Sequence, residues 1–356
     1  MLATVSEGPD DRALLAALGP LAPLYLDQAI TEIRVDSPDR VSAVRKGSVL
    51  DVPAVFSSSG EVRAVIDATL ALSGLALTGG HTVGESRLAD GSHFIAIIPP
   101  TSGDRPCLAI QRLSRSPLDW DKFVELKVLS DRARVLLSTF VHGDVGILVA
   151  GTAGSGKTTL ANLIAESIPA DQRVVVVHDL VDVPVEHPRA VHLEANTLAG
   201  VSVTDLVDTA LRLQPDWIVV GELRGAETLA VLRAMASGPR GLTTIHASSS
   251  EDALLRLEAL CLAGNAGLGS AEIRSLIAAS IQVVAFQERL PGGRRLTQIG
   301  DVHLVGDRVE VRGLMRYSPA TDRLETAGLP AEQRIKEYLS SGFADTQRRV
   351  RRSAIG

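Results

Sequence analysis

The sequence predicts an α/β protein whose larger part holds a parallel sheet and whose N-terminal part is a smaller α+β domain. From about residue 131, short apolar runs alternate with helical segments, which is typical of a parallel sheet covered by helices on both faces. The earlier residues combine helical spacing with apolar runs around short turns. We expect an N-terminal α+β domain at 1–113, a linker at 114–130, an α/β domain at 131–316 and a C-terminal tail at 317–356.

The composition is typical of a soluble globular protein with aliphatic cores. The 356 residues leave room for two domains, and 45% of them are hydrophobic, 22% charged and only 3% aromatic. The formal net charge of −6 argues against broad binding to nucleic acid, because phosphate binding needs a basic surface. We therefore expect no stable nucleic-acid binding.

The sequence gives no sign of export or of a membrane span. Acidic rather than basic residues precede the first apolar segment, which differs from a signal peptide. No run approaches the ~18 apolar residues that a membrane span needs. Cys107 and Cys261 lack metal-ligand spacing, so we interpret them as buried thiols in a reducing cytoplasm. The basic stretch Arg348–Arg352 is either a solvated end or a contact with anionic lipid or a partner.

In the N-terminal domain the elements follow one another in a simple order. Residues 11–27 have helical spacing with a break near Gly19-Pro20, and residues 31–49 indicate a strand, a Ser-Pro-Asp turn and a second strand. Residues 61–75 indicate an amphipathic helix. The stretches "RLADGSHFIAIIPP" and "CLAIQRL" indicate further strands around an Asp-Gly turn.

The larger domain begins with a helix, "DRARVLLSTFVHG", that we expect to end at Gly143. Four apolar runs then predict parallel strands, namely "VGILVAG", "RVVVVHD", "DWIVVGE" and "LTTIHA". The first run leads into a helix expected to run to Pro169. The stretch from "IQVVAF" to "VEVRGL" predicts antiparallel hairpins, with Pro-Gly-Gly at the first turn.

The strongest functional signal is a phosphate-binding loop directly after the first of these strands. Its residues match G-x-x-x-x-G-K-[ST] in full and open a helix. Glycines let backbone N–H groups converge on phosphates, and the helix N-terminus adds positive potential. We expect Lys157 to reach the β- and γ-phosphates and the Thr158 hydroxyl to bind Mg2+, so the predicted ligands are ATP and Mg2+. The predicted nucleotide-binding residues of the loop are Gly151, Thr152, Ala153, Gly154, Ser155, Gly156, Lys157, Thr158 and Thr159.

Three more ionisable residues end neighbouring strands, where the carboxyl edge of a parallel sheet would face the same phosphates. Glu222 is either a surface acid or a group that holds Mg2+ through water and polarises the attacking water. Asp179 either orients water or metal, or caps the following segment. His246 is either a structural histidine or a donor to the γ-phosphate that senses its presence.

Taken together, these residues resemble the ATPase superfamily of type II and type IV secretion and type IV pilus machines. The resemblance is strongest to CpaF-like ATPases of tight-adherence (Flp) pili and to TrbB-like conjugation ATPases, and it covers about residues 24–305. It rests on "GTAGSGKTT", "LRLQPDWIVVGELRGAET", "GLTTIHASSSEDALLRLE" and "ERLPGGRRLTQI". The N-terminal stretches "LYLDQAITEIRVDSPDRV" and "RLADGSHFIAIIPP" are also similar to that family's first domain.

The resemblance implies a RecA-like P-loop NTPase domain preceded by a smaller N-terminal domain that clamps the nucleotide. It also implies a homo-hexamer at the inner face of the cell membrane, peripherally associated with an inner-membrane platform protein. ATP hydrolysis would drive pilus assembly, secretion or DNA export. The catalytic set it implies is Lys157, Asp179, Glu222 and His246, and Arg87, Arg112 and Arg224 are added as nucleotide-facing arginines.

The chain departs from that family's pattern at several positions. His178 stands where a Glu is usual before Asp179, so Glu222 would activate water alone or turnover would be slow. His93 and Gln111 replace arginines of the N-terminal domain, although Arg112 adjoins, so clamping of phosphate between the domains would be weaker. Asp182 and Trp217 are further departures, and we interpret Trp217 as a packing residue.

The sequence is also compatible with three other functions, to different degrees. A weakly hydrolysing regulatory P-loop subunit would agree with His178. A small-molecule kinase would need an acceptor site, which the sequence does not reveal, and "TTIHA" counts against it. A DNA translocase is disfavoured by the acidic balance and by the lack of interleaved aromatic and basic residues.

Overall fold

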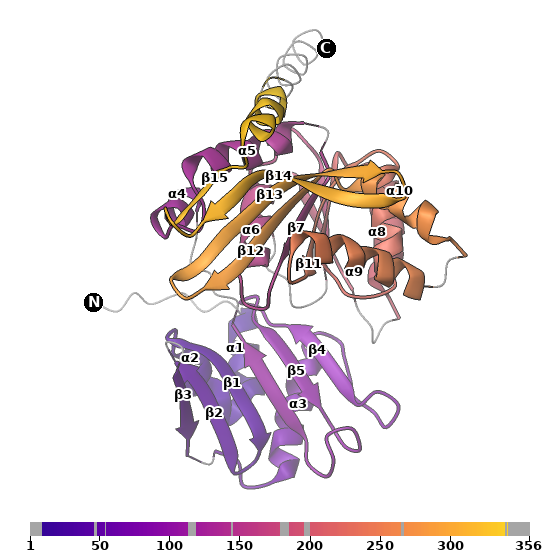
Figure 1. Ribbon diagram of the computed structural model, residues 1–356. Helices are drawn as coiled ribbons and strands as arrows, with labels where there is room; N and C mark the ends of the chain where they lie inside the picture. The colour runs from indigo at the N-terminus through magenta and orange to yellow at the C-terminus, as the bar shows by residue number, and fades with distance from the viewer. Residues whose placement is uncertain are drawn as a thin grey trace. The chain divides into compact units, whose positions relative to one another are not determined.

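Figure 1 shows a computed structural model of the chain, which describes residues 9–45, 48–53, 55–112, 119–143, 145–178, 185–195, 200–264, 267–338 and 340. The chain divides into an N-terminal unit within residues 1–116 and a larger unit within residues 117–195 and 201–356. Each unit is described by itself. In the part of the chain that is described, no helix combines the length and the apolar character needed to cross a membrane.

The N-terminal unit is a six-stranded antiparallel sheet with helices packed on it. Its strand order is β3-β2-β1-β6-β5-β4. The strands are β1 (Ile30–Ser37), β2 (Arg40–Arg45), β3 (Ser48–Val52), β4 (Val83–Arg87), β5 (His93–Ile97) and β6 (Cys107–Gln111). The helices are α1 (Pro9–Leu18), η1 (Gly19–Leu21), α2 (Ala22–Leu26) and α3 (Ser59–Ala71). Leu18, Ile33, Ile66 and Phe94 lie in the core between them.

The sequence predicted these N-terminal elements closely. The first helix breaks at Gly19, where φ is +49°, and continues as α2 after the short η1. The predicted strand pair around the Ser-Pro-Asp turn is β1 and β2, which are antiparallel. The Asp-Gly turn joins β4 to β5, with Arg87 opposite His93. Cys107 on β6 is half-buried rather than buried, whereas Cys261 is buried as expected.

The larger unit is built on a nine-stranded mixed sheet in the order β15-β14-β13-β12-β7-β11-β10-β8-β9. All pairs from β12 through β9 are parallel, and the pairs among β12, β13, β14 and β15 are antiparallel. The strands are β7 (Ile147–Gly151), β8 (Val174–His178), β9 (Ala190–Glu194), β10 (Trp217–Leu223), β11 (Arg240–His246), β12 (Val283–Leu290), β13 (Gly293–Val305), β14 (Arg308–Ser318) and β15 (Arg323–Thr326).

Two aliphatic cores cover the two faces of this sheet. One core packs α4 (Trp120–Glu125), α5 (Asp131–His142) and α6 (Lys157–Glu166) onto the sheet together with the helix at 329–338. The other core packs α7 (Val203–Arg212), α8 (Glu227–Ala236), α9 (Ser250–Ala263) and α10 (Ser270–Ser280). The central strands β7 and β8 are buried along their whole length, as apolar runs without alternation predict.

The α/β class, the four parallel strands and the antiparallel hairpins are confirmed, with five differences of detail. Strand β12 pairs in parallel with β7, and the half-exposed β9 extends the sheet beyond β8. Helix α4 lies where a linker was expected. Strand β15 and the helix at 329–338 lie where a tail was expected, because Leu324 and Ile335 supply apolar surface to the core. Helix α6 ends at Glu166, three residues before Pro169.

Candidate functional site

The glycine-rich loop joins β7 to α6 at the carboxyl edge of the sheet. Gly154 and Gly156 have φ of +67° and +96°, in the left-handed region that residues with a Cβ rarely adopt. A Cβ on Gly156 would also lie 3.0 Å from the Gln287 Nε2 atom. Helix α6 begins directly afterwards at Lys157. This strand–loop–helix arrangement is the one that a phosphate-binding loop requires.

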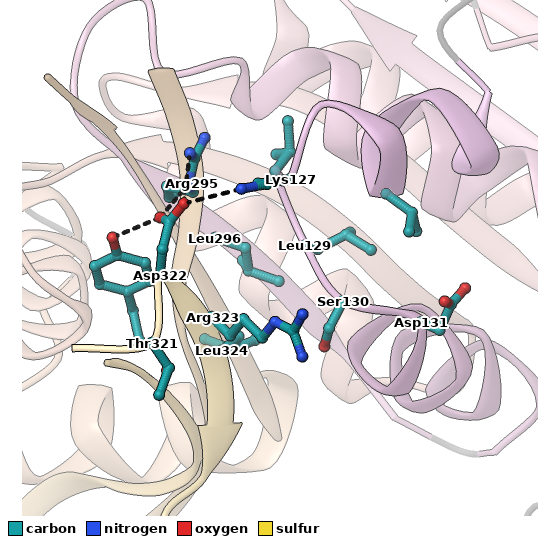
Figure 2. Close-up of a pocket in the computed structure, with 13 residues that line it drawn as sticks. Lys127, Leu129, Ser130, Asp131, Arg295, Leu296, Thr321, Asp322, Arg323 and Leu324 are labelled. Carbon is teal, nitrogen blue, oxygen red and sulfur yellow. Dashed lines mark hydrogen bonds and ion pairs between the residues drawn. The ribbon is translucent and has the colours of Figure 1, made fainter. Parts of the chain in front are cut away.

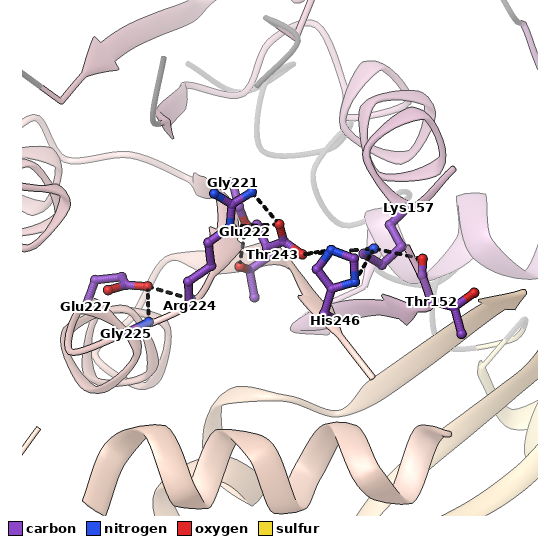
Figure 3. Close-up of polar contacts among 9 residues, drawn as sticks. All are labelled: Thr152, Lys157, Gly221, Glu222, Arg224, Gly225, Glu227, Thr243 and His246. Carbon is purple, nitrogen blue, oxygen red and sulfur yellow. Dashed lines mark hydrogen bonds and ion pairs between the residues drawn. The ribbon is translucent and has the colours of Figure 1, made fainter. Parts of the chain in front are cut away.

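Lys157 is the buried cation of the site. Its side chain is only 7% exposed. Its Nζ donates to the Thr152 carbonyl at 3.2 Å, and it lies 3.2 Å from His246 Nδ1 and 4.0 Å from Glu222 Oε1 (Figure 3). Burial lowers the pKa of the Lys157 ammonium, and the Glu222 carboxylate opposes that effect. Contacts with a backbone carbonyl and an imidazole therefore orient the ammonium.

Glu222 is the acid of the site: Arg224 binds one carboxylate oxygen, and the other, which accepts no hydrogen bond from the described residues, lies near His246. Its side chain is 10% exposed. Oε2 accepts from the Arg224 guanidinium at 2.6 and 2.9 Å, and Oε1 lies 3.1 Å from His246 Nε2. The imidazole of His246 thus lies between the lysine and the acid, as Figure 3 shows.

The register of the parallel strands explains why these three side chains meet. Gly151 at the end of β7 pairs with His246 at the end of β11. On the other side of β11, Glu222 of β10 pairs with Thr244. The chemistry-bearing residues therefore leave adjacent strands at the same edge, which is where ligands bind in open α/β sheets.

The loop after β10 is fixed by its own hydrogen bonds. Glu227 accepts from the backbone N–H groups of Arg224 and Gly225 at 2.7 and 2.8 Å. Thr243 Oγ1 donates to the Gly221 carbonyl at 3.0 Å. These contacts hold the backbone on both sides of Glu222.

Two residues of the β12–β13 hairpin, neither of them predicted from the sequence, also contact the glycine-rich loop. The buried Gln287 donates from Nε2 to the Ser155 carbonyl at 2.7 Å. Arg294 donates from Nε to the Gly154 carbonyl at 3.1 Å. The only signal in the sequence was that Arg294 belongs to the "ERLPGGRRLTQI" stretch, since the contact itself spans 140 residues.

Other predicted site residues lie elsewhere or carry less information. Thr158 and Thr159 are half-buried in the first turn of α6. Asp179 and Asp182, like the basic stretch near the C-terminus, lie outside the described residues. His178 ends β8 with its ring edge-on to His192, at 5.7 Å between centroids.

The predicted arginines Arg87 and Arg112 belong to the N-terminal unit. Arg87 ends β4. The Arg112 guanidinium lies 5.0 Å from the centre of the Tyr25 ring and donates to the Asp27 carbonyl at 3.2 Å. The aromatic ring and the carbonyl therefore orient the Arg112 side chain within its own unit.

A separate cavity of about 400 Å³ lies between the start of α5 and strands β13 to β15 (Figure 2). Asp322 at its wall is paired with Arg295 at 3.2 Å, with Lys127 at 3.6 Å and with the Tyr317 hydroxyl at 2.9 Å. These contacts lower the pKa of the Asp322 carboxyl and raise that of Tyr317. The acid in this wall is thus paired with its neighbours.

Comparison with known proteins gives a consistent result. Residues 15–313 match the family model described as "Type II/IV secretion system protein". A putative conjugal transfer protein of Mycobacterium tuberculosis (strain ATCC 25618 / H37Rv) is 30% identical over 309 residues, covering 83% of this chain and 87% of that protein. The type IV secretion system protein PtlH of Bordetella pertussis is 34% identical over 214 residues, or 58% of this chain and 59% of PtlH.

Solved structures of similar fold include two ATPase or motor proteins. The Legionella pneumophila ATPase DotB has a TM-score of 0.55 at 20% identity, covering 83% of this chain and 80% of DotB. The pilus retraction motor PilT with bound ADP has a TM-score of 0.56 at 16% identity, covering 92% of this chain and 88% of PilT. At these identities the likeness concerns the fold alone.

Proposed function

Since the chain belongs to the type II/IV secretion system protein family, we propose that it is an ATPase with a RecA-like domain that powers secretion or pilus assembly. The observation that carries this proposal is the meeting of Lys157, Glu222 and His246 at the edge of the parallel sheet, beside the glycine-rich loop. A purely structural loop would have no need for a buried lysine in contact with both an acid and an imidazole.

The residues present fit a nucleoside triphosphate and Mg2+. The glycine conformations leave the loop backbone free to cradle phosphates, and Lys157 is the cation that would pair with them. Among the described residues, no group of three or more His, Cys, Asp or Glu side chains could hold a metal. Mg2+ is usually bound through one or two protein oxygens, phosphates and water. The Thr158 hydroxyl would bind it directly, and Glu222 through water.

The chain's own groups then have separate roles. Glu222 would accept a proton from the attacking water, and Arg224 holds that carboxylate in place through Oε2. His246 would donate to the γ-phosphate and so report its presence to β11. Lys157 would stabilise charge on the β- and γ-phosphates. When bound, Mg2+ supplies charge neutralisation on the phosphate oxygens.

The proposed oligomeric state, location and machinery go beyond the family membership. We propose a homo-hexamer in the cytoplasm, peripherally bound to an inner-membrane platform protein, that assembles Flp/Tad-type pili or drives type II/IV secretion. Arg87 and Arg112 of the N-terminal unit would contribute positive charge to the nucleotide. A conjugative DNA-transfer ATPase is the second candidate, because curated relatives include a TrbB protein of Rhizobium radiobacter, 33% identical over 223 residues, and the mycobacterial putative conjugal transfer protein.

Steady-state phosphate release from ATP and Mg2+ tests the proposal. The wild-type chain should release phosphate without an added acceptor, and Glu222→Gln should lower turnover about 10³-fold with nucleotide affinity kept. Equal rates in the two proteins would favour a weakly hydrolysing regulatory subunit instead. Phosphate transfer only when an acceptor is added would indicate a kinase. Stimulation by single-stranded DNA that falls steeply with salt would indicate a DNA translocase.

A further inference from the structure

Gln287 is a fully buried polar side chain whose amide nitrogen contacts the phosphate-binding loop. It lies on β12 opposite Gly151, the last residue of β7. Its backbone carbonyl leaves no room for a side chain there, since a Cβ on Gly151 would lie 2.0 Å from it. Its Nε2 then donates to the Ser155 carbonyl at 2.7 Å. One residue of β12 therefore contacts the loop at both its beginning and its middle.

The position of that contact determines which way a loop N–H group points. In a trans peptide the C=O of one residue and the N–H of the next point in opposite directions within one plane. Holding the Ser155 carbonyl toward Gln287 therefore turns the Gly156 N–H away from Gln287. A phosphate-binding loop works by converging such N–H groups on an anion.

Arg294 holds the preceding peptide in the same manner. Its Nε donates to the Gly154 carbonyl at 3.1 Å, and the N–H of that same peptide, on Ser155, donates to the Thr152 carbonyl at 3.2 Å. The peptide is thus held at both of its polar ends. Two consecutive loop carbonyls are bound by one hairpin that follows them by 132 and 140 residues.

Gln287 is an unfavourable choice for packing alone. Its Oε1 is buried and has no hydrogen-bond partner among the residues that the structure describes. A buried unpaired acceptor costs about 1–3 kcal/mol, which a methionine or leucine of similar volume would avoid. Because the glutamine is present despite that cost, we interpret its side-chain hydrogen bond to the Ser155 carbonyl as the reason for a glutamine at this position.

We propose that Gln287 and Arg294 are positioning residues of the nucleotide site, which act by setting the peptide planes of residues 154–156 for phosphate. This inference rests on the proposed function, because it assumes that the loop binds a nucleotide. It adds that the β12–β13 hairpin determines the affinity of the site without itself touching the reacting atoms. The Gly156 N–H, which the contact between Gln287 and the Ser155 carbonyl orients, would face phosphates that ADP and ATP share, so both nucleotides should be affected.

Fluorescent ADP and ATP titrations of the full chain test the inference. Gln287→Met keeps the side-chain volume and removes the donor, and it should weaken both nucleotides about tenfold. The turnover at saturating ATP should change less than threefold, because the lost interaction acts on bound substrate and transition state alike. Arg294→Ala should show the same pattern, and Arg294→Lys should recover little because it lacks the Nε–H donor.

Matched controls exist in the same hairpin. Arg289 pairs with Arg294 across the hairpin, is exposed, and makes no contact with the loop, so Arg289→Ala changes the charge equally. A second buried glutamine, Gln298, lies on β13, and Gln298→Met makes the same chemical change away from the loop. Both should bind nucleotide as the wild type does.

The outcomes separate the two proposals. If the wild-type chain binds no nucleotide, the proposed function fails. If the wild type binds and hydrolyses ATP while Gln287→Met and Arg294→Ala keep its affinities, the positioning role alone is overturned. If Gln287→Met shows no thermal unfolding transition, Arg294→Ala decides whether the positioning role holds, because Arg294 is exposed. An affinity loss shared by the two control variants would also overturn the role.

Discussion

Lys157 shows how single residues of this site balance opposing effects. Burial removes water from its ammonium and lowers its pKa, while Glu222 at 4.0 Å favours the charged form. The remaining contacts are directional, since Nζ reaches the Thr152 carbonyl and His246 Nδ1 at 3.2 Å each. A cation held in this way needs little rearrangement when an anion arrives, which is the property that electrostatic catalysis requires.

His246 gives the sharpest prediction at this scale. His246→Asn should lower turnover about 10²-fold, because the shorter asparagine amide would not reach the γ-phosphate to which we propose that the imidazole donates. Affinity for ADP should stay within about threefold of the wild type, since ADP lacks that phosphate. Steady-state hydrolysis and fluorescent-ADP titration measure the two quantities. His142→Asn, at the end of α5, is the control and should match the wild type in both. A parallel loss of ADP affinity would contradict the sensor role.

At the scale of elements, the order of helices and strands was predictable because local patterns determine it. The buried strands β7 and β8 read as uninterrupted apolar runs, and the capped helix α5 ends at Gly143 as its sequence indicates. Partners across the sheet were not predictable, since the apolar pattern of β12 does not specify whether it pairs with β7. The half-exposed β9 was missed because it lacks a buried face with clear alternation.

The residues of the candidate site also differ in whether a local pattern in the sequence predicts them. Lys157, Glu222 and His246 were found because each stands at a recognisable position, in the loop motif or at the end of an apolar run. Gln287 and Arg294 were missed because their contacts with the loop cross 132 and 140 residues, and no local pattern signals them. Arg224 was selected, but its pairing with Glu222 depends on side-chain directions that only the structure gives.

The junction of β7 with α10 and β12 depends on the absence of a side chain at Gly146. A Cβ there would lie 1.9 Å from the Ser280 carbonyl, which is backbone and cannot move aside. Gly146→Ala should lower the free energy of unfolding by about 2–4 kcal/mol, measured by urea denaturation. Gly292→Ala is the control, because its Cβ would meet only an Arg295 side-chain atom at 3.5 Å. An unchanged midpoint for Gly146→Ala would contradict this packing.

The loop from His246 to α9 contains a titratable contact. Asp252 accepts from the Ser248 N–H at 2.7 Å and from Arg256 at 3.0 Å, and these bonds, the backbone one foremost, lower the pKa of its carboxyl. A carboxyl whose pKa is lower in the folded chain than in the unfolded chain stabilises the fold at pH values above its ordinary pKa. That stabilisation is lost as pH falls through the pKa of the folded state. Asp252→Asn should therefore be less stable than the wild type at pH 7.

The difference in stability between the wild type and Asp252→Asn should shrink as pH falls below 3.8, the ordinary pKa of the carboxyl. Thermal unfolding at pH 7 and at about pH 3 measures it. Asp208→Asn changes an exposed acid on α7 and should have no effect at either pH. If the Asp252→Asn deficit persisted unchanged in acid, the carboxylate contacts would not be its cause.

At the scale of the molecule, the proposed site is a property of the whole larger unit. Its groups come from β7 and α6, from β10, from β11 and from the β12–β13 hairpin, and the sheet order sets these strands side by side. No two consecutive elements contain the full set. The site should therefore form and be lost together with the sheet, in a single cooperative transition of that unit.

The oligomeric state tests the largest-scale part of the proposal. Glu222→Gln should bind ATP and Mg2+ without consuming them, so the ligand stays available to stabilise a ring by mass action. Light scattering should then report six times the mass of one chain at saturating ATP. Lys157→Ala should show the same mass with and without ATP, because its nucleotide affinity is lost. A Glu222→Gln chain that keeps a single-chain mass at saturating ATP would contradict the hexamer, and a Lys157→Ala chain that assembles equally would contradict its dependence on nucleotide.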